Sequence, residues 1–280
     1  YWSFYVNGNY ASGGAPAYYL KDGDFVEFRY VKGDGTQVPG SEPSTNPSAE
    51  HPEVDVDWNG YANGGNGSIS GAPTPTTATA NPSWASDILT EEQQNAGASA
   101  TASDPLIIDG DVYMVTGASI WGGKTWNARL AVFDGDTGEL KKSVDLATSM
   151  DSTCRPVYAD GIIVIPLAGG ALQAVSAKTL ETIWYVPATG GQSLSSLTVD
   201  SGYVYAATLL KFGEKQDAYK AVSGAVRRYN LKTGALAATY ANDEAGYYWA
   251  GGVVVNGYYV VGDDSGCVKA LDANLSVVSS

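Results

Sequence analysis

Residues 105–117 read PLIIDGDVYMVTG, and the same pattern recurs as RPVYADGIIVIPL from Arg155, SLTVDSGYVYAATLL from Ser196 and GGVVVNGYYVVGD from Gly251. Each copy is a short apolar run, a tight turn that ends in glycine, and a second apolar run. The turn glycines stand at 110, 161, 202 and 257, at spacings of 51, 41 and 55 residues. A repeat of about 40–50 residues that contains several short strands is typical of propellers and β-solenoids.

Each repeat also contains two further strands, joined by a turn such as GDTG or LKTG. Antiparallel neighbours joined by tight turns need glycine or asparagine where the backbone has positive φ. The sequence therefore predicts an all-β fold in which residues 105–280 form four consecutive antiparallel sheets of up to four strands, each facing the next. Such propellers usually close with six to eight blades, so the four repeats are either part of a larger polypeptide or an open arc of four blades, and we expect the former.

The remainder of the chain divides into two further segments. Residues 1–31 alternate large apolar and polar residues around the turn signals Asn7-Gly8 and Asp22-Gly23, which predicts a small partial β unit. Residues 32–53 are rich in Pro, Gly, Ser and Thr, and we expect a loosely packed linker that proteases cut first. Residues 54–280 then form the incomplete propeller.

Charge and composition exclude several classes of protein. The 280-residue chain has a net charge of −14, which argues against nucleic acid and anionic membranes as partners. No apolar run reaches the roughly 18 residues that span a bilayer, so we expect no membrane insertion. The single histidine, His51, lies in the linker segment, where neither packing nor an acid partner would hold it for catalysis. We therefore expect no catalytic residues and no enzymatic activity.

The closing hairpins of the repeats read AVFDGDTGELKKS, AVSAKTLETIWYV, RYNLKTGALAATY and ALDANLSVVSS. They resemble the pyrroloquinoline-quinone-like repeat, whose closing hairpin reads roughly Ala-x-Asp-x-x-Thr-Gly-x-x-x-Trp, with the Trp present here only as Trp184. The resemblance covers residues 54–280 and implies a β-propeller. The family includes quinone dehydrogenases, outer-membrane assembly scaffolds and surface proteins. Its dehydrogenases often carry adjacent cysteines, which this chain lacks, so we expect no quinone and no other cofactor.

The first 31 residues resemble the C-terminal half of the transcobalamin-like domain of bacterial surface proteins. The resemblance rests on the pattern W-x-x-Y-V-N-G and on an L-K-D-G-D hairpin that ends in a tyrosine. The matching residues are Trp2, Tyr5, Val6, Asn7, Gly8, Leu20, Lys21, Asp22, Gly23, Asp24 and Tyr30. It implies an exported or cell-surface protein. Since the sequence does not contain the other half of such a domain, we expect no cobalamin binding.

One segment resembles the start of a calcium loop. Asp55, Asp57 and Asn59 precede Gly60 in the order D-x-D-x-N-G, but Asn66 replaces the glutamate that closes such a loop. The segment is either a calcium site or a structural turn, and we expect the turn and no metal.

The candidate binding residues are aromatic and lie in three segments between strands. The segments are TGASIWGGKTWN from Thr116, LLKFGEKQDAYKAVSG from Leu209 and ANDEAGYYWAGG from Ala241. Their candidate ligand-binding residues are Trp121, Trp126, Phe212, Tyr219, Tyr247 and Trp249. By strand order all three segments project from one face, and exposed rings beside Asp, Asn and Gln suit sugars or peptides. The alternative is that the rings pack against the scaffold.

The sequence thus predicts a non-enzymatic binding or adhesion module of an exported or surface bacterial protein, with a protein or carbohydrate as its ligand. The alternative is an exported scaffold protein or a fragment of a quinone-dependent dehydrogenase.

Overall fold

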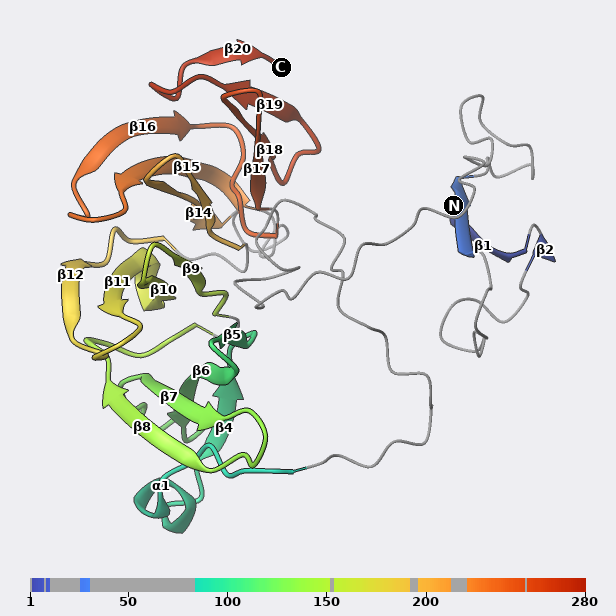
Figure 1. The fold of residues 1–280 in the computed structure, drawn as a ribbon. Helices are drawn as coiled ribbons and strands as arrows, with labels where there is room; N and C mark the ends of the chain where they lie inside the picture. Colours follow the sequence, from blue (N-terminus) through green and yellow to red (C-terminus); the bar gives the residue numbers. More distant parts are fainter. Residues whose placement is uncertain are drawn as a thin grey trace. The chain divides into compact units, whose positions relative to one another are not determined.

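The computed structural model describes residues 2–7, 9–10, 26–30, 84–151, 154–191, 196–212, 221–249 and 251–280 (Figure 1). The chain divides into two compact units, one comprising residues 1–54 and 71–80 and the other residues 55–70 and 81–280. The predicted linker at 32–53 and the predicted turn or calcium segment at 55–59 lie outside the described residues.

The first unit contains a three-stranded antiparallel sheet. Its strands are β1 (Trp2–Val6), β2 (Asn9–Tyr10) and β3 (Val26–Tyr30), in the order β2-β1-β3. Asn7 has a φ of 51°, as a tight hairpin between β1 and β2 requires. Val6 is buried and packs with Val26 of β3.

The second unit contains four antiparallel sheets, which we call blades 1 to 4 in chain order. Blade 1 consists of β4 (Ser99–Ala102), β5 (Leu106–Ile108), β6 (Asp111–Ser119), β7 (Arg129–Asp134) and β8 (Leu140–Asp145). Blade 2 consists of β9 (Val157–Ala159), β10 (Ile162–Leu167), β11 (Ala171–Ser176) and β12 (Thr182–Val186). Blade 3 consists of β13 (Thr198–Asp200), β14 (Tyr203–Phe212), β15 (Ala221–Asn230) and β16 (Leu236–Asn242). Blade 4 consists of β17 (Gly252–Val255), β18 (Tyr258–Gly262), β19 (Val268–Leu271) and β20 (Val277–Ser279).

In each blade the strands pair in sequence order, and the blades follow one another from green to red in Figure 1. The predicted four consecutive antiparallel sheets are confirmed. Blade 1 departs from the pattern because β4 and β5 both pair with β6. Between them the backbone N–H of Ser103 still donates to the Val115 carbonyl, and Pro105, which cannot donate, follows. The two strands therefore act as one interrupted first strand.

The first turn of every blade has the same backbone conformation. The turn glycines 110, 161, 202 and 257 have φ between 77° and 81°. The residues before them, Asp109, Asp160, Ser201 and Asn256, have φ between 48° and 52°. Two successive positive φ values define the type I′ turn, whose twist matches that of antiparallel strands. The repeated glycine turns from which the fold is predicted therefore reflect a local requirement for positive φ at two successive residues.

Three apolar cores lie between successive blades. The first joins blades 1 and 2 through residues such as Leu130 and Ile163. The second joins blades 2 and 3 and includes Val164 and Val204. The third joins blades 3 and 4 and includes the stacked rings of Tyr205 and Tyr259, 4.7 Å apart. Each middle blade thus buries both faces, one against each neighbour.

The second turn of blades 1 and 3 is closed by a tryptophan from outside the blade. Gly138 and Gly234 have φ of 74° and 69°. The indole of Trp84 lies against Gly138, and that of Trp184, from β12, lies against Gly234. Each indole N–H donates a 2.8 Å hydrogen bond to a carbonyl of the turn it covers. Glycine is required there because a Cβ would enter the ring.

The second turns of blades 2 and 4 have a leucine, not a glycine, at the position with positive φ. The left-handed position of their second turn is Leu180 or Leu275, with φ of 62° and 60°. The prediction that these turns carry Gly or Asn at positive φ is therefore wrong for two of the four. Both leucines are buried, at 4% and 2% exposure, and the outer strand of the blade before each contains no tryptophan. The leucine side chain therefore fills space that the indole fills at the other two turns.

A short helix precedes blade 1. Helix α1 (Glu91–Asn95) begins after Thr90, whose side chain and that of Gln93 form a capping box. Of the described helices, none is long and apolar enough to cross a membrane.

Candidate functional site

One end of the blades, which we call the loop face, carries the predicted aromatic segments. Because the strands alternate in direction, each second-to-third-strand loop and each connection to the next blade emerge at this end. Residues 120–128, between β6 and β7, lie there, as do the described residues of the connections from blade 1 to blade 2 (146–151 and 154–156) and from blade 3 to blade 4 (243–249 and 251). The loop face is therefore where side chains from different repeats can converge.

The loop of blade 1 extends the β6–β7 hairpin and fixes Trp126. Ser119 and Thr125 form an isolated bridge, and the Trp126 backbone N–H donates to the Ala118 carbonyl at 3.0 Å. Trp121 stands at the tip, next to Gly122 with φ of 70°, and its side chain is fully exposed. The two tryptophans of this loop therefore differ, since one is held in place and the other is free in solvent.

The indole of Trp126 is held by two charged side chains. Its Nε1 donates to Glu92 of α1 at 3.3 Å, and Lys124 lies over the ring at 4.4 Å from its centroid. Lys124 also pairs with Glu92 at 3.0 Å. Hydrogen bonds from Lys124 and Trp126 lower the pKa of the Glu92 carboxyl. One face of the ring thus contacts a cation, and the orientation of the ring is fixed before any ligand arrives.

Trp126 lines a cavity of about 270 Å³ at the loop face. The described residues around this cavity are Thr101, Gly117, Ala118, Ser119, Thr125, Trp126, Ser149, Met150 and Asp151. Four of them carry hydroxyl groups, and the last three come from the connection between blades 1 and 2. A Cβ on Gly117 would lie 2.7 Å from Met150, so the glycine makes room for that side chain.

Asp151 is the only ionisable side chain among these lining residues. Burial raises the pKa of its carboxyl, and a hydrogen bond from the Gly169 backbone acts in the opposite direction. A carboxylate in a partly desolvated position gains more from ligand hydrogen bonds than one in water. The cavity therefore combines one aromatic ring, one carboxylate and several hydroxyls.

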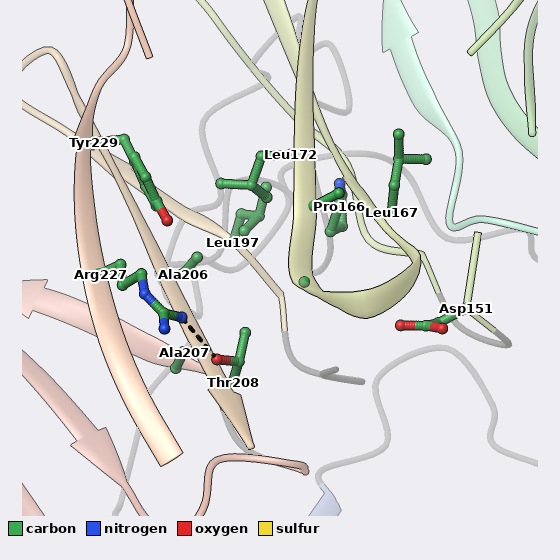
Figure 2. A pocket seen from close by; sticks show the side chains of 12 residues that line it. Asp151, Pro166, Leu167, Leu172, Leu197, Ala206, Ala207, Thr208, Arg227 and Tyr229 are labelled. Carbon is green, nitrogen blue, oxygen red and sulfur yellow. Dashed lines mark hydrogen bonds between the residues drawn. The ribbon is translucent and has the colours of Figure 1, made fainter. Parts of the chain in front are cut away.

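Asp151 also borders a second, narrower hollow between blades 2 and 3 (Figure 2). Its free volume of about 20 Å³ is enough for about one water molecule. Arg227 and Thr208 lie on one side, 3.4 Å apart, and Asp151 lies on the other (Figure 2). Between them the wall is apolar and includes Pro166 and Leu172. The loop face is thus hollowed on both sides of Asp151.

A second aromatic group lies where blades 3 and 4 meet. Phe212, at the end of β14, contacts Tyr248 edge-on at 5.3 Å between ring centroids, and Tyr248 contacts Trp249 at 4.7 Å. The Asp264 carboxylate accepts the backbone N–H groups of Tyr248 at 2.8 Å and Trp249 at 3.4 Å. Trp249 is 63% exposed. The structure therefore brings Phe212 and Trp249 into one group, apart from the cavity of blades 1 and 2.

Tyr247 does not belong to either group. Its side chain is completely buried in the core between blades 3 and 4, and Asn242 donates to its hydroxyl at 3.3 Å. Burial raises the pKa of Tyr247 to about 12. The prediction that Tyr247 is exposed on a binding surface is wrong, because the chain turns this ring inward to complete the core. Tyr219 lies outside the described residues.

Sequence reasoning missed the residues that complete the cavity. Ser149, Met150 and Asp151 lie in the segment LATSMDSTCRP, which shows no aromatic or periodic signal. Their position in the repeat could have indicated them, because the connection between blades 1 and 2 emerges at the same end of the blades as the loop that carries Trp126. Among the described residues, no three His, Cys, Asp or Glu side chains gather closely enough to hold a metal ion.

Residues 1–32 match the family model described as Domain of unknown function (DUF4430). This match agrees with the transcobalamin-like resemblance of the first 31 residues. No curated protein matches the chain in sequence.

Several solved structures are similar to part of the chain. BamB from Moraxella catarrhalis is 18% identical, with a TM-score of 0.46 over 64% of this chain and 49% of its own. The quinohemoprotein alcohol dehydrogenase ADHIIG from Pseudomonas putida HK5 is 15% identical, with a TM-score of 0.46 over 63% of this chain and 33% of its own. The computationally designed Ika4 protein is 16% identical, with a TM-score of 0.41 over 62% of this chain and 91% of its own. The chain thus spans half or less of the length of the two natural proteins.

Proposed function

We propose that the chain is a binding or adhesion module of an exported or cell-surface bacterial protein, and that its cavity at blades 1 and 2 binds a saccharide ring without reaction. The exported location rests on the transcobalamin-like resemblance of residues 1–31. The observation that carries the binding proposal is the cavity that Trp126 and Asp151 share.

The chemistry of the lining suits a sugar. An indole face stacks on the C–H face of a pyranose, and a carboxylate and hydroxyl groups exchange hydrogen bonds with sugar hydroxyls. The volume of about 270 Å³ lies just below the range for drug-sized ligand pockets, about 300–1,000 Å³. The cavity therefore accommodates one ring, and a longer glycan would extend beyond it along the loop face.

The same lining favours binding over hydrolysis. Glycoside hydrolysis generally needs two carboxyl groups on opposite sides of the scissile bond. Asp151 is the single carboxyl group among the nine described lining residues. The side chains around the cavity thus supply recognition groups without a paired acid and base.

A glycan array probed with the intact chain, followed by calorimetric titration of the strongest glycan, tests this proposal. We expect Trp126→Ala to weaken binding about 10- to 100-fold, equal to about 1–3 kcal/mol, because the stacking face is lost. Tyr185→Ala is the matched control, since Tyr185 is 41% exposed on the outer strand β12 and lies outside the cavity. Trp121→Ala in the same titration tests the predicted contribution of the exposed ring at the loop tip.

Absence of binding to any saccharide on the array would contradict the proposal. Equal affinities of the Trp126→Ala variant and the unchanged chain would place the site elsewhere and would also contradict it.

A further inference from the structure

The hollow between blades 2 and 3 is lined by one cation, Arg227 of β15 (Figure 2). Its side chain is half-buried, and its guanidinium donates a 3.4 Å hydrogen bond to the Thr208 hydroxyl. With the described residues this guanidinium makes no other hydrogen bond and no ion pair. A half-buried cation that no carboxylate neutralises gains strongly from an anionic partner.

The corresponding place in blade 4 contains the carboxylate that Arg227 lacks. Arg227 and Lys269 are equivalent, since each pairs across the sheet with the residue four positions after the first-turn glycine. Thr208 and Asp263 are also equivalent, at six positions after that glycine. In blade 4 Lys269 forms an ion pair with the buried Asp263. The cation of blade 3 therefore contacts a hydroxyl group where the cation of blade 4 contacts a carboxylate.

The shape and lining of the hollow suit the end of a carboxylate group. The wall between Arg227 and Asp151 is apolar and includes Pro166, Leu172 and Leu197 (Figure 2). Apolar walls lower the local dielectric and strengthen an ion pair formed beside them. The free volume of about 20 Å³ is enough for one water molecule, and hence for one carboxylate oxygen. The remainder of such a ligand would lie outside the hollow.

Charge and geometry favour a carboxylate over a phosphate. The chain has a net charge of −14, and Asp151 lies across the hollow from Arg227 (Figure 2). A doubly charged anion would therefore meet more repulsion here than a singly charged one. A planar carboxylate also matches the planar guanidinium, which can donate two parallel hydrogen bonds to it.

We propose that the hollow between blades 2 and 3 is a binding site for a carboxylate group, which Arg227 binds through its guanidinium. The carboxylate belongs to a small organic acid or to an acidic sugar. The site does not require a saccharide in the Trp126 cavity, although Asp151 borders both the cavity and the hollow.

Titration of the intact chain with sodium acetate, followed by saturation-transfer NMR of the acetate methyl protons, tests the proposal. We expect a saturable signal that sodium chloride at equal ionic strength does not remove. Inorganic phosphate should displace acetate only at concentrations at least about 10-fold above those of acetate itself, because of its shape and second charge.

Three variants identify the group that binds acetate. Arg227→Gln should weaken binding at least about 10-fold. Arg228→Gln is the matched control, because it removes the same charge from the opposite face of the strand, where Arg228 donates to the Ala273 carbonyl at 2.7 Å. It should leave acetate binding unchanged. Thr208→Asp retains Arg227 but supplies it with a carboxylate, as in blade 4, and should abolish acetate binding. Circular dichroism verifies that each variant is folded.

Glucuronic acid and glucose distinguish the two sources of the carboxylate. Binding of glucuronic acid at least about 10-fold tighter than both acetate and glucose would identify an acidic sugar, and a smaller difference would identify a small organic acid. Trp126→Ala should leave acetate binding unchanged, so failure of the saccharide proposal and failure of the carboxylate site are separable. Absence of saturable binding of both acids, or undiminished acetate binding in Arg227→Gln or Thr208→Asp, would overturn the proposal.

Discussion

Replacing Gly234 with alanine is expected to destabilise the blades far more than the same replacement at Gly202. Both glycines have a left-handed backbone, with φ of 69° and 77°. A Cβ on Gly234 would lie 2.7 Å from Cδ2 of Trp184, whereas a Cβ on Gly202 would meet no atom within 4 Å. The pair therefore separates the steric conflict with the indole from the backbone strain that both variants share.

The magnitudes follow from these two contributions. Alanine in the left-handed region costs about 1–2 kcal/mol at either position. Forcing a methyl group into a packed contact adds about 1–3 kcal/mol, since the Trp184 ring is only 8% exposed and is held by its hydrogen bond to Leu231. We expect Gly202→Ala to lower the free energy of unfolding by about 1–2 kcal/mol and Gly234→Ala by about 2–5 kcal/mol.

Guanidinium unfolding followed by circular dichroism measures these differences, and a double-mutant cycle with Trp184→Ala isolates the contact. Trp184→Ala alone should cost about 3–5 kcal/mol. In that background the cost of Gly234→Ala should fall to the backbone strain seen at Gly202. Equal costs for the two glycine variants, or no change in the cost of Gly234→Ala when the indole is absent, would refute the reasoning.

Three further results are expected. Hydrogen bonds from Lys269, Ser265 and the Cys267 backbone outweigh the effect of burial and lower the pKa of Asp263 to about 2 from its ordinary 3.8. A lowered folded-state pKa stabilises the fold above about pH 4, so the free energy of unfolding should lose about 2 kcal/mol between pH 4 and pH 2, and Asp263→Asn should remove that part of the acid dependence. Burial raises the pKa of Asp151 above 3.8. As pH falls, saccharide affinity measured by calorimetry should therefore begin to decrease at a higher pH than it would for a solvent-exposed aspartate, because the carboxylate becomes protonated earlier. The Asp151→Asn variant should not show this pH dependence. In thermal melts Trp121→Ala should change stability by less than about 0.5 kcal/mol, because the ring is fully exposed, whereas Tyr247→Ala should cost about 3–5 kcal/mol; similar melting temperatures would contradict their different burial.

The sequence alone determined the four blades. Their first turns need two successive residues with positive φ. Residue pairs that readily adopt this conformation, such as Asp109-Gly110 and Asn256-Gly257, stand at these positions and are recognisable in the sequence. The apolar runs on either side give strands that pair with their sequence neighbours, so register follows from the turn. The turn conformation and the pairing of neighbouring strands each depend on only a few adjacent residues. The same signal occurs in all four repeats, so each repeat predicts the same blade.

Only the tertiary structure decided which side chains form the site. Tyr247, Tyr248 and Trp249 are consecutive, and nothing local distinguishes the fully buried ring from the two that are half-buried or exposed. The choice follows from the space left between blades 3 and 4, where Tyr247 completes a core. Asp151 likewise reaches the Trp126 cavity because blade 2 packs on blade 1 and brings their connection beside the loop. Such contacts join residues that the sequence places far apart or in irregular segments, so no short-range pattern encodes them.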